Sequence, residues 1–166
     1  MCYMERILLA VDSGTANRCF PGGHNGLMGK IINEFLPRFT PGGVPVYIAD
    51  NRKQPAFLDQ DYLRIFGITA KDRGGMPNLV VHLASKDWLI LIEAVTSHGP
   101  VNTRRRRELT SVFARSRGNL VFVTAAPNRK VLSKYLGEIA WGTSVWVADA
   151  PDHMIHFNND RLLGPR

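Results

Sequence analysis

Hydrophobic residues recur along this chain with two different spacings, and each spacing predicts a kind of element. The first helix-like segment covers residues 24–39, with apolar residues at Leu27, Met28, Ile31, Ile32, Phe35 and Leu36. This spacing places them on one face of a helix, and we expect Pro37 to end or kink it. A second helix is predicted over residues 58–68, where Gly67 is suited to closing it.

Nearly continuous apolar runs predict strands in the middle of the chain. The run "NLVVHLA" begins at Asn78 and the run "WLILIEAVT" at Trp88, with a polar turn at residues 85–87 between them. We therefore expect an antiparallel hairpin. The second run is apolar at almost every position before Glu93, which is typical of a central strand covered on both faces.

The second half of the chain alternates between strands and helices. Helices are predicted over residues 103–117 and 128–140, and further strands are predicted within 42–50 and at 119–125, 143–150 and 154–160. This alternation favours an α/β fold in which a mixed central sheet is flanked by helices. A length of 166 residues suits one compact domain, so we expect a single domain over residues 1–166.

The composition is that of a globular protein, with 45% hydrophobic and 21% charged residues. No apolar run reaches the ~18–20 residues of a membrane span, and the start "MCYMERILLAVDSG" does not resemble a secretory signal. Two cysteines, Cys2 and Cys19, do not make a disulfide framework. We therefore expect a cytoplasmic protein with free thiols and no membrane partner.

Positive charge is concentrated in one stretch of the chain. The net charge is +7, and residues 101–134 hold nine cations and one anion, Glu108, for a net charge of +8. Such a concentration indicates a polyanionic partner, most often a nucleic acid. A basic surface that serves only solubility is the alternative on charge alone.

Glu93 is unusual because it lies near the end of a strand that is otherwise apolar. A buried carboxylate needs a cation, a metal ion or a raised pKa; alternatively, Glu93 reaches solvent or pairs with an arginine at the strand end. Hairpin pairing would bring it close to Asn78. Two side-chain oxygens at one end of a sheet suit a hard cation such as Mg²⁺, although an amide brings no charge and would bind it more weakly than Asp.

The segment after Glu93 carries further candidate chemistry. Asn102 or Thr103 can cap the predicted helix, whose first turn holds four consecutive arginines, Arg104 to Arg107. Because the helix dipole disfavours cations there, a bound phosphate explains them better than helix stability does. We expect some of the four to contact a nucleic-acid backbone and others to be solvated or paired with Glu108 or the sheet edge.

Two other kinds of site are less favoured. Ser97 and His98 are adjacent and lack an orienting third group, which argues against a nucleophile–base pair. The remaining histidines, His24, His82, His153 and His156, show no ligand spacing typical of zinc and have no cysteines nearby.

The segments "LIEAVTSHGPV", "LVFVTA", "PDHMIHFN" and "DRLLGPR" resemble the catalytic domain of the PstI/BsuBI family of type II restriction endonucleases. The resemblance runs from about Ile7 to Arg166. The family is similar to the PD-(D/E)XK nucleases, which implies a mixed sheet flanked by helices and Mg²⁺ at the active centre, with Mn²⁺ as a substitute. It also implies a homodimer acting on double-stranded DNA. Full-length members carry an N-terminal domain, which we expect to be absent here.

The resemblance implies roles for individual residues. Asn78 stands where such nucleases have Asp, Glu93 matches the second acid, and Val95 replaces the usual lysine, whose substitute would be Arg104 or Arg105. The predicted catalytic residues are Glu93, Asn78 and His98, and the predicted metal ligands are Glu93, Asn78 and Ala94. The predicted DNA contacts are Arg104, Arg105, Arg107, Ser97, Lys130 and Arg161.

Several departures from the family pattern remove polar groups near the expected catalytic end. Besides Asn78, Gly23 and Gly142 stand in place of Glu, and "RGGMPN" replaces an expected His-Asp-Lys before Pro-Asp. Three functions follow as hypotheses: a Mg²⁺-dependent endonuclease, a DNA-binding homologue with weakened or lost cleavage, and a regulatory partner in a restriction system. In the first, Glu93 holds the metal with Asn78 as an uncharged second ligand; a member that gathers its metal differently would use Glu93, Glu34 or Asp50.

Overall fold

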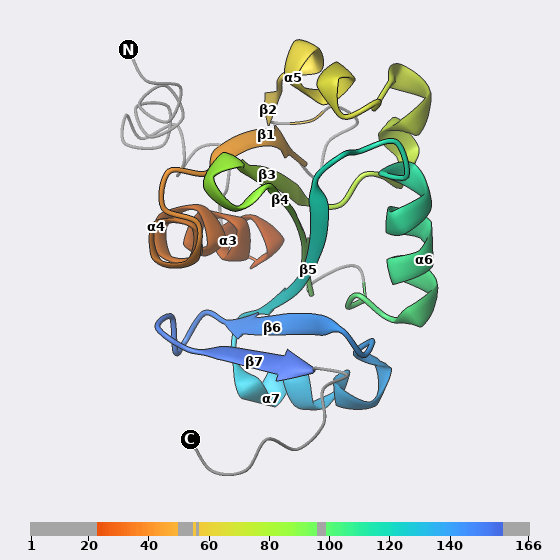
Figure 1. Ribbon diagram of the computed structural model, residues 1–166. Helices are drawn as coiled ribbons and strands as arrows, with labels where there is room; N and C mark the ends of the chain where they lie inside the picture. The colour runs from red at the N-terminus through yellow and green to blue at the C-terminus, as the bar shows by residue number, and fades with distance from the viewer. Residues whose placement is uncertain (1–22, 50–54, 56, 96–98, 158–166) are drawn as a thin grey trace.

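The computed structural model describes residues 23–49, 55, 57–95 and 99–157, which build a mixed sheet with helices on both faces (Figure 1). The strands are β1 (Val44–Ile48), β2 (Phe57–Leu58), β3 (Leu79–Leu83), β4 (Trp88–Ala94), β5 (Asn119–Ala126), β6 (Thr143–Val147) and β7 (Met154–Phe157). The α-helices are α3 (Gly23–Lys30), α4 (Leu36–Phe39), α5 (Gln60–Ile65), α6 (Thr103–Val112) and α7 (Arg129–Ser133). The predicted α/β class is therefore confirmed.

β4 is the central strand of the sheet, whose order is β2-β1-β3-β4-β5-β6-β7. It pairs antiparallel with β3, with Leu79 opposite Ile92 and Leu83 opposite Trp88, as the hairpin prediction required. On its other side it pairs parallel with β5. The ends of β4 and β5 consequently meet at one edge of the sheet, together with the start of β3.

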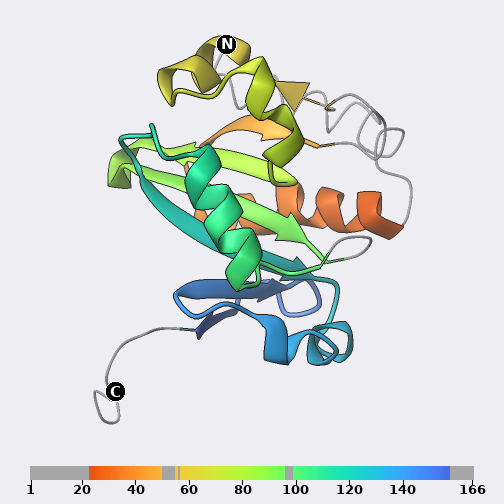
Figure 2. The same cartoon turned by 90° about the vertical axis from the view of Figure 1, so that its right-hand side faces the viewer.

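Side chains of β4 alternate between two cores on opposite faces of the sheet. Ile90 and Ile92 pack in a cluster with residues of α3 and α4, whereas Leu89 and Leu91 pack in a second cluster that includes Leu109 of α6. Figure 2 shows α6 lying across that second face. Burial on both faces explains why this strand is almost continuously apolar.

The first described helical segment continues through Pro37 to Phe39, so Pro37 does not end it, and the alternative of a kink stays a prediction. A π-helical segment, Ile31–Phe35, connects α3 to α4, and the N–H of Leu36 donates to the carbonyl of Ile31. A π-helical turn changes the hydrogen-bond register just before the proline. Pro37 then falls in the first turn of α4, where a missing N–H is tolerated.

Two other predicted helices were too long. The helix expected over residues 103–117 ends at Val112. The helix expected over residues 128–140 is divided into α7 and a short 3₁₀ helix, Leu136–Glu138. In the described part of the chain, no helix combines the length and apolar character needed to cross a lipid bilayer.

The "RGGMPN" segment begins in a 3₁₀ helix, Ala70–Gly75, and its last three residues connect this helix to β3. Thr69 and Asp72 form a capping box at its start: Asp72 Oδ2 accepts hydrogen bonds from the backbone N–H of Thr69 at 2.8 Å and from its hydroxyl at 3.1 Å. The backbone hydrogen bond is the main cause that lowers the pKa of Asp72 below its ordinary value. This cap fixes the backbone immediately before Met76.

The capping box predicts a pH-dependent stability difference for Asp72→Asn. Because the folded-state pKa of Asp72 is below its ordinary value of 3.8, its stabilising effect is complete above that pH and is lost as the pH falls further. Urea unfolding should therefore show Asp72→Asn less stable than the parent protein at pH 7, with the difference shrinking below pH 3.8. Asp61→Asn, which alters an exposed ion pair with Arg64, is the control. A pH-independent difference would contradict this account.

Candidate functional site at the end of the β3–β4 hairpin

The alternation of side chains on the hairpin directs Asn78 and Glu93 toward the face that α6 covers. Glu93 follows Leu89 and Leu91 at two-residue spacing, and Asn78 precedes Val80 by two residues; these three apolar residues belong to the core cluster that contains Leu109 of α6. Both Asn78 and Glu93 are buried. The sequence prediction that they meet at one end of the sheet agrees with the register of the hairpin.

Arg105 of α6 is the cation that pairs with Glu93. Its Nε lies 2.6 Å from Glu93 Oε1, and the side chains are 23% and 6% exposed, respectively. The same guanidinium donates from Nη2 to the carbonyl of Met76 at 3.0 Å and from Nη1 to Glu108 at 3.5 Å. Arg105 therefore ties the end of β4 to the segment before β3 and to its own helix.

Asn78 makes a structural hydrogen bond with the neighbouring strand. Its Oδ1 accepts from the backbone N–H of Ala94 at 2.9 Å, and its carbonyl accepts from the N–H of Ala49 at 2.7 Å. An amide oxygen fills this role without adding a second negative charge beside Glu93. Ala94, predicted as a metal ligand through its backbone, is itself fully buried.

The start of α6 is anchored by polar contacts on both sides. Asn102 caps the helix, its Oδ1 accepting from the N–H of Arg105 at 2.8 Å. The N–H of Val101 donates to the hydroxyl of the buried Thr124 on β5 at 3.0 Å. Because these contacts fix the helix start against β5, they also fix where the guanidinium of Arg105 enters the sheet edge.

The four arginines of α6 have different environments, as the sequence had predicted. Arg105 enters the sheet edge, whereas Arg104 is exposed and pairs with Glu108 at 2.9 Å. Arg106 stacks over the ring of Phe122, 5.7 Å from its centroid, and Arg107 is exposed. Lys130, on α7, is exposed as well. The DNA-contact roles assigned to these residues remain predictions.

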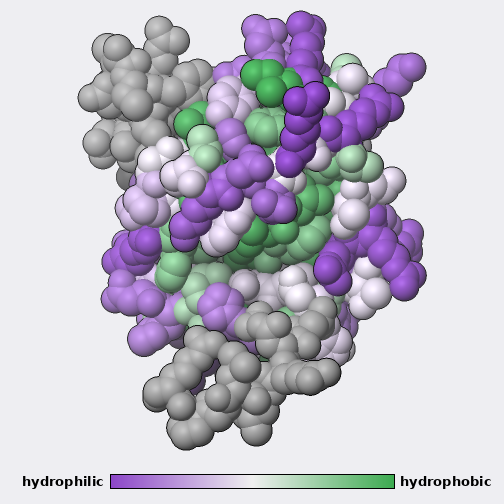
Figure 3. All heavy atoms as spheres, in the orientation of Figure 1, coloured by the Kyte–Doolittle hydropathy of each residue, from purple (hydrophilic) through white to green (hydrophobic). Residues whose placement is uncertain are grey.

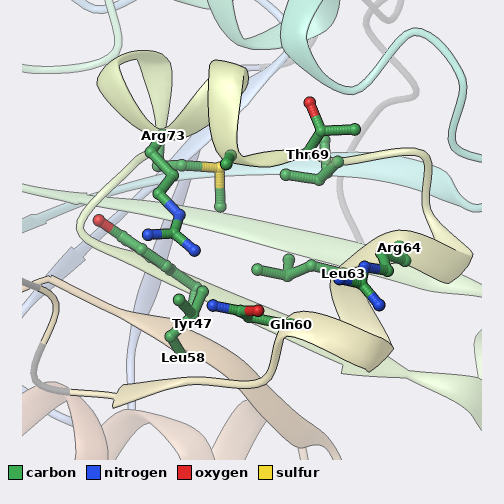
Figure 4. Close-up of a pocket in the computed structure, with 10 residues that line it drawn as sticks. Tyr47, Leu58, Gln60, Leu63, Arg64, Thr69 and Arg73 are labelled. Atoms are coloured by element: carbon green, nitrogen blue, oxygen red, sulfur yellow. The ribbon is translucent and has the colours of Figure 1, made fainter.

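A pocket of ≈ 170 Å³ lies beside the site, between β1, β2, α5 and the Ala70–Gly75 segment. In this pocket, Arg73 extends toward Tyr47 and Gln60 (Figure 4). Burial raises the pKa of the Tyr47 hydroxyl; the charge of Arg73 opposes this effect and that of Glu93 adds to it. Tyr47 thus lies within electrostatic range of Glu93.

Four of the predicted site residues cannot be placed at this end of the sheet or elsewhere, because Ser97, His98, Arg161 and Asp50 lie outside the described residues. Glu34 belongs to the helix on the opposite face of the sheet, where it pairs with Arg38 at 2.6 Å. It therefore does not join Glu93, and the hypothesis that it supplements a metal site there is wrong in this arrangement.

The described residues do not fit a divalent metal ion in this arrangement. Mg²⁺ prefers an octahedral set of oxygens that includes one or two carboxylates. No group of three or more His, Cys, Asp or Glu side chains converges within the described ranges. The carboxylate of Glu93 is bound by Arg105, and the side-chain oxygen of Asn78 accepts from the backbone of β4.

Sequence reasoning did not identify Thr124, Tyr47 or Arg73 as neighbours of the site. Thr124 lies within the apolar strand β5, where an isolated hydroxyl is the available signal. Tyr47 and Arg73 come from segments whose association with Glu93 depends on the pairing of β1 with β3. No local pattern in the sequence predicts that pairing.

The Glu93–Arg105 pair predicts non-additive effects on stability. Arg105→Gln removes a guanidinium from a buried carboxylate and should lower the free energy of unfolding by about 2–3 kcal/mol, below the usual loss for a fully buried pair because Arg105 is partly exposed. Adding Glu93→Gln should restore part of that loss, as measured by urea unfolding in a double-mutant cycle. Arg104→Gln, which breaks the exposed pair next to it, should cost less than about 1 kcal/mol. Additive effects of Arg105→Gln and Glu93→Gln would contradict a direct interaction.

Comparisons with known proteins agree with the family resemblance of the sequence. The BsuBI/PstI restriction endonuclease domain matches residues 7–160. Type II restriction enzyme BsuBI of Bacillus subtilis is 48% identical over 97% of this chain and 51% of its own length. Type II restriction enzyme AplI of Arthrospira platensis is 34% identical over 86% of this chain and 46% of its own length.

A solved structure of SdaI restriction endonuclease is also similar, with a TM-score of 0.79 and 44% identity over 87% of this chain and 46% of that one. The chain spans about half the length of the curated relatives that it matches. The sequence match and the shared fold together show that this chain belongs to the BsuBI/PstI restriction endonuclease domain family.

Proposed function

We propose that this chain is a restriction endonuclease domain that hydrolyses phosphodiester bonds of double-stranded DNA. The observation that carries the proposal is the family match over residues 7–160. Two relatives are named type II restriction enzymes. Because the chain covers about half of each, we propose the activity of these full-length relatives for this chain.

The chemistry of the hairpin end supports this function. Glu93 provides a carboxylate beside the guanidinium of Arg105, and the planar fork of an arginine recognises phosphate as well as carboxylate. We assign Glu93 to the reacting end of the site and Arg104, Arg105 and Arg107 to the DNA backbone. Asn78 holds the last strand residue in place through its hydrogen bond to Ala94.

Mg²⁺, with Mn²⁺ as a substitute, is the proposed cofactor because type II restriction enzymes typically need a divalent cation. The described residues offer Glu93 as a carboxylate at this end of the sheet, but not a ligand set. The proposed cofactor therefore rests on the family alone, and the roles of Asn78, Ala94 and His98 as ligands or catalytic groups stay predictions.

The proposed partners are duplex DNA and a second copy of the chain. Cutting both strands of a palindromic site requires two equivalent active sites, which a two-fold symmetric dimer supplies. We place the protein in the cytoplasm, where the DNA of a bacterial cell is accessible.

DNA binding without cleavage is the second candidate function. It is favoured by the presence of Asn78 where the family resemblance implies Asp, and by the pairing of Glu93 with Arg105. In this case the arginines of α6 would bind DNA while the hairpin end serves only the fold.

A cleavage assay separates these two functions. Purified protein with Mg²⁺ or Mn²⁺ should convert plasmid DNA to discrete linear fragments, and Glu93→Gln should reduce the rate by about 100-fold or more. Glu34→Gln, on the opposite face of the sheet, should leave the rate unchanged, and thermal unfolding should show that both variants fold. Salt-dependent binding of duplex DNA with no cutting on plasmids of diverse sequence would favour the second candidate.

Asn78→Asp tests whether the second acid limits the activity. A carboxylate at this position would lie beside Glu93 while still accepting from Ala94, so the repulsion between the two acids should lower the thermal midpoint without divalent cations. Mn²⁺ should raise that midpoint by more in the variant than in the parent protein, and the cleavage rate should increase. A variant whose melting and cleavage are both insensitive to Mn²⁺ would show that an acid at position 78 is not sufficient.

A further inference from the structure

A groove runs alongside α6, between this helix and the turn that precedes β6. Its volume is ≈ 680 Å³, and its lining includes Thr103, Arg106, Arg107, Thr110, Ser111 and Trp141. Figure 2 shows the start of α6 next to the segment that connects α7 to β6. The groove therefore begins at the same end of α6 from which Arg105 reaches Glu93.

Arg106 and Arg107, the two arginines that line the groove, differ from Arg104 and Arg105 in their ion pairs. Arg104 and Arg105 share Glu108, and Arg105 also pairs with Glu93. Within the described ranges, neither Arg106 nor Arg107 forms an ion pair with an acid. The space-filling view shows hydrophilic side chains gathered over α6 (Figure 3). This side of the helix is suited to an anionic ligand.

Trp141 forms the opposite wall of the groove and is 66% exposed. Its position is fixed by its neighbours: the N–H of Ala140 donates to the carbonyl of Val101 at 3.0 Å, and the indole lies 6.0 Å from the ring of Phe157. Gly142 follows at a φ of 75°, the left-handed conformation that lets the chain turn into β6. A large aromatic ring held at the surface in this way is suited to contact with a ligand.

The positive charge of the groove distinguishes between two possible occupants, a second copy of the chain and a nucleic-acid strand. In a two-fold contact between copies of the chain, the same surface of both copies forms the interface, so the arginines of both copies would be brought together in it. A nucleic-acid strand carries a phosphate at every nucleotide, which complements the arginines, and sugars and bases that can pack on an indole. The hydroxyls of Thr103 and Ser111 can donate further hydrogen bonds to phosphate oxygens.

We propose that this groove binds the sugar–phosphate backbone of one strand of duplex DNA beside the site at Glu93. Arg106 and Arg107 bind successive phosphates, and Trp141 packs against the deoxyribose between them. This assignment rests on the proposed function, because it extends the DNA surface of the same protein from the helix start along α6 to the turn before β6.

Binding without cleavage tests the assignment. Fluorescence anisotropy of a labelled duplex, measured in EDTA over a range of salt concentrations, gives the affinity and its salt dependence. The double variant Arg106→Gln/Arg107→Gln should bind about tenfold or more weakly, and the slope of log affinity against log salt should decrease by about two, one for each phosphate contact. Arg64→Gln/Lys71→Gln removes the same charge from exposed positions on α5 and on the Ala70–Gly75 segment and should change the slope by less than about 0.5.

Trp141 offers an independent readout. Duplex DNA should quench the tryptophan fluorescence of the parent protein. Trp141→Phe should lose most of this quenching, because Trp146 is buried in the core and Trp88 lies at the start of β4, the end opposite Glu93. Trp141→Ala should weaken binding by about tenfold. Thermal unfolding serves as the folding control, and the altered side chains are exposed or partly exposed.

The possible outcomes distinguish this inference from the proposed function. If the parent protein binds and cuts DNA while the groove variants match it in affinity and salt slope, the groove assignment is wrong and the nuclease proposal stands. A parent protein that binds no duplex overturns both. If Trp141→Ala changes the sedimentation of the protein but not its DNA affinity, the groove is a contact between copies, and the assignment is equally overturned.

Discussion

An ionised carboxylate at the covered end of β4 needs an opposite charge within the protein, and Arg105 supplies it. The 2.6 Å pair between these groups joins the central strand to α6, and the contact of Arg105 with the Met76 carbonyl joins both to the segment before β3. This pair therefore links the position of α6 to the charge balance of the site. Because Arg105 in the first turn of α6 has to reach Glu93, the rotation of the helix about its axis is fixed. That rotation determines the directions in which the neighbouring arginines point.

The pairing of Glu93 with Arg105 also explains why the hairpin end is compatible with an amide at position 78. Asn78 accepts a hydrogen bond from the backbone of Ala94 and adds no negative charge, so one arginine is a sufficient counter-ion for Glu93. A second carboxylate would raise the charge of the site and its affinity for a divalent cation at the same time. Membership of a restriction endonuclease family and an arginine-bound carboxylate are therefore compatible.

Much of the fold could be predicted from the sequence, because the apolar runs and their polar turn specify the hairpin and the central position of β4. The candidate site was only partly predictable. Hairpin pairing placed Glu93 and Asn78 together, but local pattern could not choose Arg105 among four consecutive arginines, since the choice depends on how α6 lies on the sheet. Pro37 does not end the first helical segment, because it falls in the first turn of α4 after the π-helical segment. The sequence did not indicate Trp141 as a site residue. Its place beside α6 depends on the hydrogen bond between Ala140 and Val101, a long-range contact that no periodic pattern in the sequence predicts.

Arg105 is the counter-ion of Glu93 in this structure. A crystal of the protein without DNA, soaked in Mn²⁺ and measured with anomalous difference maps, would show whether a metal ion can take that place. We expect the guanidinium of Arg105 to stay on Glu93, with no anomalous peak between Glu93 and Asn78. An anomalous peak coordinated by these two side chains, with Arg105 turned away from the carboxylate, would contradict this expectation.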